Sequence, residues 1–355
     1  MTTPLASNYQ EARRRFLAAS QQAGATVDAH VHPLRGPDGG ELAVDVATIG
    51  GAADRNLVVV VSGTHGVEGF AGSAIQSRLL EQGVTLPRST TLVLIHALNP
   101  YGFAWIRRTN EDNIDLNRNF VPFDAPPSND RYSEIADLLV PSSWDDDSQE
   151  HSFGALLALL EQWGMAELQE VVSSGQYEHP LGLFYGGVKP SWSHELLHEL
   201  CAGHLSGYEQ TFIVDLHTGL GPWGVGELIS ALPPTSAEFE RDLNALGDDL
   251  KSVVSGDSVS AALSGEWITA ATSWLRPSVV TAVTIEYGVV DIIEVLLALR
   301  ADTWLHGYGD PSGSEAGAIK AALRAAFIDD SPEWAELTWN RFTEVMDRIA
   351  RSLGA

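Results

Sequence analysis

Residues 57–69 read Leu57-Val58-Val59-Val60-Val61-Ser62-Gly63-Thr64-His65-Gly66-Val67-Glu68-Gly69. The first five side chains are all aliphatic, with no alternation of polar and apolar positions. Such a run is typical of a strand covered on both faces, as in the middle of an α/β sheet. Sheets of this kind bind ligands at the carboxyl ends of their strands. The polar residues that follow the run are therefore expected to lie at a functional site.

The turn after this strand places an imidazole, His65, three residues before a carboxylate, Glu68. Both groups can reach one point, which suggests a metal. A catalytic zinc ion takes three protein ligands from His, Glu, Asp or Cys and leaves a fourth position for water. The best candidate for the third ligand is His217, because residues 212–217 again form an apolar run that ends in a histidine. We therefore expect these three residues to hold one Zn²⁺.

A dense polar loop follows a second predicted strand, residues 91–96. It reads Arg107-Arg108-Thr109-Asn110-Glu111-Asp112-Asn113-Ile114-Asp115-Leu116-Asn117-Arg118-Asn119-Phe120. Loops with this many Arg and Asn side chains usually bind an anionic group. The chain has a formal charge of −26, so an anionic substrate needs local arginines to overcome the surrounding field. Arg107, Arg108 and Arg118 are the candidates.

Taken in order, these residues resemble the zinc carboxypeptidase (carboxypeptidase A-like) superfamily. They suggest a bacterial-type branch between the carboxypeptidases and the aspartoacylase and succinylglutamate desuccinylase deacylases. The resemblance rests on His65-x-x-Glu68, Arg108, residues 115–120, His217 and Glu286, which occur in the family's order. An isolated His-x-x-Glu pair is a weak signal, but the ordered set, each member after a predicted strand, is specific. The resemblance implies an α/β fold with a mixed, mostly parallel central sheet and helices on both faces.

The resemblance also assigns the residues that act on the substrate. Glu286, after the predicted strand 278–285, matches the family's catalytic glutamate, which deprotonates a water molecule and protonates the departing amide nitrogen. Arg108 matches the cation that stabilises the negative charge on the carbonyl oxygen. The neighbouring Arg107 is a second candidate for that contact, although the interval from Arg108 to Asn117 fits the motif better.

Two further residues match the pair that grips the substrate's carboxylate. They are Asn117, through an amide hydrogen bond, and Arg118, through its planar fork. Asp115 matches the carboxylate that orients the first zinc histidine, here His65. Asp215 could act similarly on His217, but we expect a structural role for it.

One feature departs from the true carboxypeptidases. They place a tyrosine, which closes over the substrate, between the second zinc histidine and the catalytic glutamate, whereas residues 218–285 contain no tyrosine. The deacylase branch also lacks it there. Tyr185, or less plausibly Tyr287, could supply a phenol from another part of the chain. The departure weakens the case for ordinary trimming of peptide carboxyl ends.

Length and composition restrict the class of protein. The 355 residues suit one large α/β domain, so we expect a single catalytic domain over residues 1–355. The 47 acidic and 21 basic side chains argue against nucleic acid or an anionic membrane surface as a partner. The chain has a single cysteine, Cys201, and no pattern typical of a signal peptide or a membrane span. We expect a cytoplasmic protein, and the sequence leaves its oligomeric state open.

Outside the motifs, the chain reads as alternating strands and helices. Residues 27–33 and 42–49 predict an edge hairpin, and residues 121–207 predict an inserted helical subdomain near the mouth of the site. Residues 236–252 predict one helix. His30 and His32 could form a metal pair, but two histidines on one face of an edge strand are better explained without a metal. His96 is expected to be a core histidine.

The sequence therefore predicts a zinc-dependent hydrolase that cleaves an amide bond in a small peptide or N-acyl amino acid with a free carboxylate. Cobalt, nickel or manganese would also suit two imidazoles and a carboxylate. The nearest alternative is an aspartoacylase-like or desuccinylase-like deacylase. An alternative of another class is a catalytically silent protein that binds zinc or another ligand.

Overall fold

A single sheet runs through the molecule. The computed structural model describes residues 5–51, 53–83, 85–261 and 263–354. Within these ranges the strands form an 8-stranded sheet in the order β1-β2-β4-β3-β5-β8-β6-β7. The strands are β1 (Thr26–Arg35), β2 (Glu41–Ile49), β3 (Asn56–Ser62), β4 (Thr90–His96), β5 (Gln210–Trp223), β6 (Gly226–Ser230), β7 (Leu250–Ser252) and β8 (Val279–Gly288).

The centre of the sheet is parallel and its margins are mixed. Strands β4, β3, β5 and β8 pair in parallel, whereas β1 pairs with β2, β2 with β4, and β6 with β8 in antiparallel. The register between β5 and β8 places His217 opposite Glu286, and that between β3 and β5 places Ser62 opposite Leu216. The mixed, mostly parallel α/β sheet expected from the sequence is confirmed.

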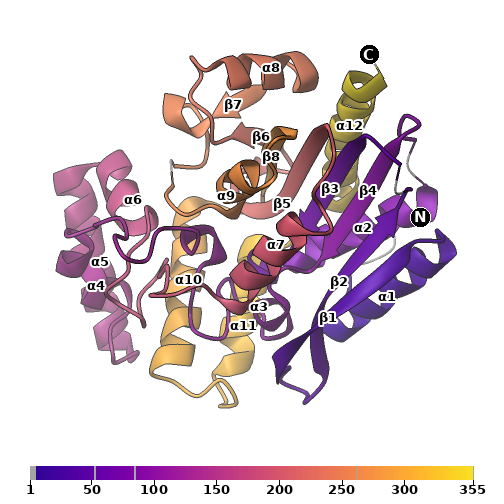
Figure 1. Cartoon of the computed structure of the whole chain (residues 1–355). Helices are drawn as coiled ribbons and strands as arrows, with labels where there is room; N and C mark the ends of the chain where they lie inside the picture. The colour runs from indigo at the N-terminus through magenta and orange to yellow at the C-terminus, as the bar shows by residue number, and fades with distance from the viewer. Residues whose placement is uncertain (1–4, 52, 84, 262, 355) are drawn as a thin grey trace.

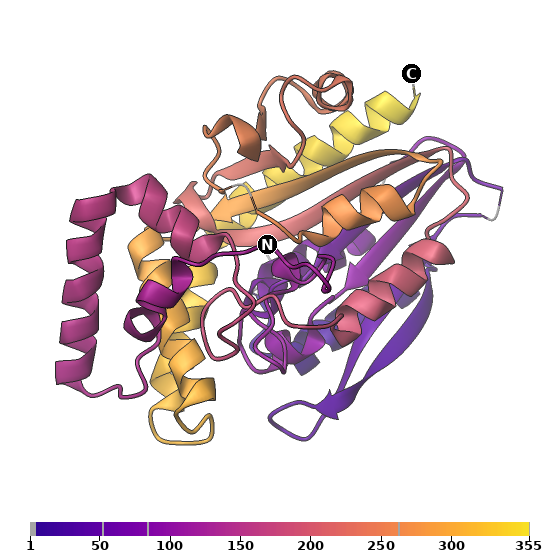
Figure 2. The ribbon, with the colours of Figure 1, turned by 60° about the vertical axis from the view of Figure 1, so that its left-hand side comes forward.

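Helices cover both faces of the sheet (Figures 1 and 2). Val58 and Val60 of β3 belong to a core that includes side chains of α1, α2 and α12. Val59 and Val61 point to the opposite face and pack with side chains of α7 and α9. These helices are α1 (Tyr9–Gln22), α2 (Gly69–Gln82), α7 (Trp192–Ala202), α9 (Trp267–Trp274) and α12 (Pro332–Gly354). Burial on both faces explains why the strand has no polar positions.

The segment 121–207 is mainly helical. Its first three helices form a lobe beside the sheet, next to α10 and α11 (Figures 1 and 2). The remaining helices are α3 (Pro100–Ala104), α4 (Tyr132–Leu139), α5 (Asp146–Trp163), α6 (Met165–Ser173), α8 (Ala237–Leu246), α10 (Ile292–Gly307) and α11 (Ala316–Phe327).

Two element boundaries differ from the sequence prediction. The helix expected over residues 236–252 ends at Leu246, and residues 250–252 form strand β7 instead. Gly247, with φ +102°, ends the helix because this backbone conformation favours glycine. Strand β5 does not stop at His217 but continues to Trp223, where it still pairs with β8 beyond an irregularity.

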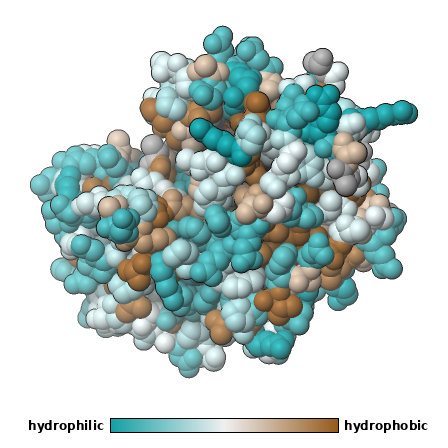
Figure 3. Space-filling model, viewed as in Figure 1, coloured by the Kyte–Doolittle hydropathy of each residue, from teal (hydrophilic) through white to brown (hydrophobic). Residues whose placement is uncertain are grey.

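The surface agrees with the acidic composition. The face shown in Figure 3 is mostly hydrophilic, and hydrophobic atoms show near the junction between the α4–α6 lobe and the body of the molecule. In the described part of the chain, no helix combines the length and the apolar character needed to cross a bilayer.

Close packing of α2 on β3 yields a test of the fold. A Cβ on Gly72 would lie 2.5 Å from the Cβ of Ser62, so Gly72→Ala is expected to lower the free energy of unfolding by about 1–3 kcal/mol through overpacking. The matched control is Gly154→Ala in α5, where an added Cβ meets nothing within 4 Å. That variant should gain about 0.5–1 kcal/mol. Denaturant titration measures both, and a Gly72→Ala variant as stable as the parent would contradict the packing.

Candidate active site

The turn after β3 is fixed by contacts with the rest of the protein. His65 lies between β3 and the short 3₁₀ helix η1 (Gly66–Glu68). The amide of the first η1 residue donates to the Arg108 carbonyl at 3.1 Å. A Cβ at that glycine would lie 2.0 Å from the carbonyl carbon of Gly102, so no larger residue fits there. The turn therefore holds both of its polar side chains in defined positions.

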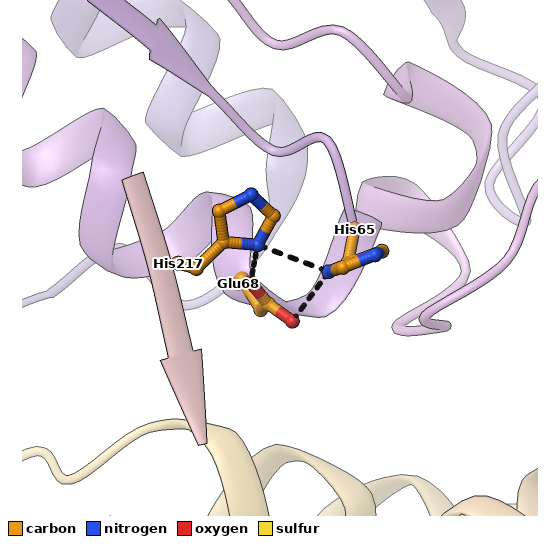
Figure 4. Close-up of side chains that lie close together, drawn as sticks. All are labelled: His65, Glu68 and His217. Atoms are coloured by element: carbon orange, nitrogen blue, oxygen red, sulfur yellow. Dashed lines mark hydrogen bonds and ion pairs between the residues drawn. The ribbon is translucent and has the colours of Figure 1, made fainter. Parts of the chain in front are cut away.

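The three predicted metal ligands converge. The Nδ1 atom of His65 lies 2.9 Å from Oε1 of Glu68, and the Nδ1 atom of His217 lies 2.9 Å from Oε2 of the same carboxylate. The two Nδ1 atoms are 3.1 Å apart, and Figure 4 shows the three side chains facing one another. All three are buried, and their ligand atoms lie within 4.8 Å of one another. This group could hold a metal ion.

A carboxylate holds the other ring nitrogen of each histidine. The Nε2 atom of His65 lies 3.2 Å from Oδ1 of Asp115, and that of His217 lies 2.7 Å from Oδ2 of Asp215. A ring that donates from Nε2 has its lone pair on Nδ1, so three acceptors face one another in the triad. A tetrahedral zinc ion with bonds of about 2.0–2.1 Å spaces its ligand atoms by about 3.3 Å. The observed separations fit such an ion after small adjustments.

The electrostatics of the triad favour a cation as well. Burial by itself raises the pKa of Glu68, but the two histidines outweigh it and hold this pKa well below its usual value. Burial by itself lowers the pKa of His217, but Asp215 and Glu68 raise this pKa well above its usual value. The negative charge of the buried carboxylates therefore attracts a proton or a metal ion to this position.

The contacts of Asp215 are compatible with both roles expected for it. Besides its contact with His217, this carboxylate accepts hydrogen bonds from Thr64 Oγ1 at 2.8 Å and from Trp267 Nε1 at 2.7 Å. It is therefore fully held by neighbours while it orients a candidate metal ligand.

Glu286 lies beside the triad on the neighbouring strand β8, opposite His217 in the sheet register. Its Oε1 atom accepts a hydrogen bond from the Leu220 amide at 2.9 Å. Among the described residues no donor reaches Oε2, and the side chain lines the cavity that contains the triad. Burial and the nearby Glu68 raise the pKa of Glu286 to about 7, against opposing effects of His217, the Leu220 amide and Arg108. A carboxyl group with this proton affinity can exchange a proton near neutral pH.

The structure separates the two neighbouring arginines. Arg108 lines the cavity, donates from Nε to Asp115 at 2.9 Å and lies 3.4 Å from Glu68 through Nη1. Arg107 points away: its Nε donates to Asp302 on α10 at 3.3 Å, and its Nη2 donates to Asn113 at 2.9 Å. Arg107 does not line the cavity, so the geometry does not support it as a substrate contact.

Asn117 and Arg118 also line the cavity, but Arg118 already has partners. Its Nε and Nη2 atoms both donate to the Ser173 carbonyl at the end of α6, at 3.0 and 2.5 Å, and its Nη1 donates to the Asn117 carbonyl. The guanidinium also lies 5.4 Å from the centre of the Phe184 ring. Arg118 thus connects the polar loop to the α6 helix.

Neither candidate tyrosine lies in the cavity, whose lining contains no tyrosine in the described part of the chain. The carbonyl of Tyr185 accepts the Asp115 amide at 2.8 Å, and its side chain is buried outside the lining. Tyr287 is completely buried and packs against Trp334. Tyr185, expected to contact the substrate, is therefore not among the residues that line this cavity.

Beside the predicted site residues, Glu266 and Phe184 also line the cavity. Glu266 precedes α9 and lines the cavity; burial raises its pKa to about 7, although Arg118 and His217 oppose the shift. Phe184 lies against Arg108 and Arg118 with a φ of 53°. Neither residue belongs to a motif or follows an apolar strand, so no sequence signal separates them from surface residues.

The other histidines lie elsewhere. His32 is buried, with Nε2 3.3 Å from Glu111 and its ring edge-on to Trp192. His96 is a core residue that stacks on Phe16 and contacts Ser73, as expected. Among the described residues, His65, Glu68 and His217 are the one group of three potential ligands that converges, so His30 and His32 form no such site.

The chain is similar to several solved structures at low sequence identity. Bovine thrombin-activatable fibrinolysis inhibitor in complex with tick carboxypeptidase inhibitor is 12% identical, with a TM-score of 0.46 over 90% of this chain and 96% of that chain. A metallo-carboxypeptidase from Burkholderia cenocepacia is 15% identical, with a TM-score of 0.38 over 93% and 69%. The succinylglutamate desuccinylase from Chromobacterium violaceum is 16% identical, with a TM-score of 0.37 over 88% and 73%.

Sequence comparison gives one match. No curated protein matches the chain. A family model described as "Protein of unknown function (DUF2817)" matches residues 5–341. Because this match includes the sheet, the triad and the helical lobe, the chain belongs to the family of that description.

Proposed function

We propose that this protein is a zinc-dependent hydrolase that cleaves an amide bond in a small peptide or N-acyl amino acid with a free carboxylate. One observation carries the proposal: His65, Glu68 and His217 converge in a buried cavity whose lining also contains Glu286 and Arg108. A buried carboxyl group and a partly buried guanidinium beside three convergent candidate metal ligands are the groups that amide hydrolysis needs.

Glu286 is the proposed general base and acid. His65, Glu68 and His217 would hold a divalent ion, which would supply Lewis-acid chemistry by lowering the pKa of a water molecule and polarising a carbonyl group. Glu286 accepts the proton of the attacking water through its unpaired Oε2 while the oxygen–carbon bond forms. It then gives this proton to the amide nitrogen as the carbon–nitrogen bond breaks. The Leu220 amide holds the other carboxylate oxygen at 2.9 Å and so fixes the direction of transfer.

Arg108 is the proposed partner of the carbonyl oxygen. Its Nε and Nη1 atoms are occupied by Asp115 and Glu68, which hold the guanidinium in place. Among the described residues, no acceptor forms a hydrogen bond with Nη2. This nitrogen can therefore donate to the carbonyl oxygen, on which negative charge develops. Asp115 contacts both His65 and Arg108 and thereby fixes the candidate metal ligand relative to the proposed oxyanion donor.

The substrate carboxylate is assigned to Asn117 and Arg118. Arg118 now donates twice to the neutral carbonyl of Ser173, and an ionised carboxylate is the stronger acceptor for a guanidinium. Substrate binding would therefore replace the Ser173 carbonyl with the substrate carboxylate as the acceptor for Arg118.

We further propose that residues 121–207 form an inserted helical subdomain, within one catalytic domain, that borders the mouth of the site.

The second candidate is a deacylase of the aspartoacylase or desuccinylase type. The observation in its favour is that residues 218–285 contain no tyrosine, which the resemblance also implies for that branch. Among the described residues, no tyrosine from elsewhere in the chain lines the cavity. A silent zinc-binding protein is disfavoured because it has no need for the unpaired carboxylate oxygen of Glu286 beside the triad.

Metal binding tests the triad directly. We expect the purified protein to bind one divalent ion per chain, and His65→Ala or His217→Ala to abolish this binding because each removes one of three ligands. Metal analysis after dialysis against trace zinc measures the stoichiometry. His30→Ala is the control and should retain the ion. Equal metal content in the His65→Ala variant and the parent would overturn the assignment.

The role of Glu286 separates an enzyme from a binding protein. Glu286→Gln should reduce hydrolysis of N-acyl amino acids by about 10²–10⁴-fold, because the proton acceptor is lost, while the metal content stays at one ion. Initial rates and metal analysis on the same preparation measure both effects. The control is Glu227→Gln on the neighbouring strand, which pairs with Glu286 and should retain activity. Unchanged hydrolysis by Glu286→Gln would refute the mechanism.

Recognition of the carboxylate depends on Arg118. Arg118→Ala should lower kcat/KM for free-acid substrates by about 10- to 100-fold, since a charge-assisted contact is lost, and should have little effect on the matching amidated substrates. A loosened α6 helix would instead reduce both substrates alike. Arg131→Ala, which removes an exposed ion pair with Glu167 in the same segment, is the control that should change neither.

A further inference from the structure

The cavity that contains the triad has two chemically different parts. The polar part comprises the site residues His65, Arg108, Asn117, Arg118, His217 and Glu286. Most of the remaining lining is apolar and includes Leu156, Leu160, Leu168, Val172, Leu296 and Leu299. We infer that the substrate carries a long, flexible aliphatic chain that lies between α5, α6 and α10 while its amide group lies at the triad. This inference rests on the proposed function and specifies its substrate class.

The apolar part continues to the surface of the molecule. Four large apolar residues of α5, α6 and α10 are at least 37% exposed and line this same cavity: Leu157, Met165, Ile293 and Leu297. The lobe and α10 stand side by side in both views of the ribbon (Figures 1 and 2). Exposed apolar side chains that gather around one opening mark a place where a ligand covers them. Scattered surface leucines would need no such explanation.

Two further charged side chains line the cavity, Glu266 and Arg300. Glu266 lies near Arg118 and His217, at the polar part. Arg300 is on α10, where its Nε donates to the Leu139 carbonyl at 2.8 Å and its Nη2 to Ser152 at 2.6 Å. Burial lowers the pKa of Arg300 to about 10. Apart from Arg300, the side chains that α10 contributes to the lining are apolar, which suits a hydrocarbon chain.

The size of the cavity permits such a chain. Its volume of about 190 Å³ has room for roughly a dozen water molecules. Leucine and methionine side chains of the walls can adjust to an unbranched chain of varying length. Each methylene that leaves water should improve binding by about three- to fourfold until the apolar part is filled.

Two parts of an N-acyl amino acid could supply the aliphatic chain: the acyl group and the side chain of the carboxylate-bearing residue. Two substrate series distinguish them. One series varies the acyl group of N-acyl-alanine from acetyl through hexanoyl and decanoyl to tetradecanoyl. The other keeps the acetyl group and varies the side chain from alanine through norleucine to 2-aminodecanoate. We expect kcat/KM of the zinc-loaded full chain to rise by about three- to fourfold per methylene in one series. Values that stay flat or fall in both series overturn the inference.

Matched variants locate the effect in the cavity. Leu157 and Leu181 are 41% and 42% exposed, but only Leu157 lines the cavity. Leu157→Gln should reduce the ratio of kcat/KM for the decanoyl or 2-aminodecanoate substrate to that for N-acetyl-alanine by several-fold. Leu181→Gln should leave that ratio unchanged. Equal ratios in both variants would place the apolar selectivity outside this cavity and overturn the inference.

A binding measurement separates this inference from the proposed hydrolysis. Calorimetric titration of Glu286→Gln with N-decanoyl-alanine and N-acetyl-alanine needs no turnover. Tighter binding of the decanoyl compound, or of N-acetyl-2-aminodecanoate, supports the aliphatic site even if no substrate is hydrolysed, in which case the proposed function alone fails. Equal binding of long and short compounds refutes the aliphatic site even if the parent hydrolyses N-acetyl-alanine.

Discussion

The site depends on the in-register parallel pairing of β3, β5 and β8. Ser62 at the end of β3 pairs with Leu216, and His217, the next residue of β5, pairs with Glu286. Two candidate metal ligands follow β3, a third lies on β5 and the proposed base lies on β8, so a common edge of the sheet brings all four together. A slip of one residue would turn every side chain of the slipped strand to the opposite face. Such a slip in β5 or β8 would turn His217 or Glu286 away from the other groups of the site.

The buried charges around the triad are compensated by neighbouring groups of opposite charge. Asp115 contacts His65 with one oxygen and Arg108 with the other. Burial by itself raises the pKa of Asp115, but Arg108, His65 and Arg118 hold it well below its usual value. Removal of one partner would leave an uncompensated buried charge, which is far more costly than the loss of an exposed ion pair. The polar loop is therefore as much a part of the folded core as it is of the site.

The helical lobe borders the cavity of the candidate site. Side chains of α5, α6 and α10 share one cavity with the triad, and Arg118 connects the loop to the end of α6 through the Ser173 carbonyl. A carboxylate that binds Arg118 would release this connection. The Arg118 guanidinium would then couple two events. These are the binding of the substrate carboxylate and a change in the position of α6, which forms part of the apolar lining.

The amino-acid sequence was enough to predict the central strands, the order of the motif and the three convergent candidate ligands. Unbroken runs of β-branched residues favour buried strands, and side chains at the ends of neighbouring parallel strands lie close together. The directions in which adjacent side chains point followed only from the folded structure. Arg107 donates to Asp302 on α10, whereas Arg108 lines the cavity. In the same way, Phe184 lines the cavity and its neighbour Tyr185 does not. Asp215 reaches His217, and Arg118 is already bound to Ser173. The direction of each of these side chains depends on partners that are distant in the sequence. A local sequence pattern therefore cannot predict it.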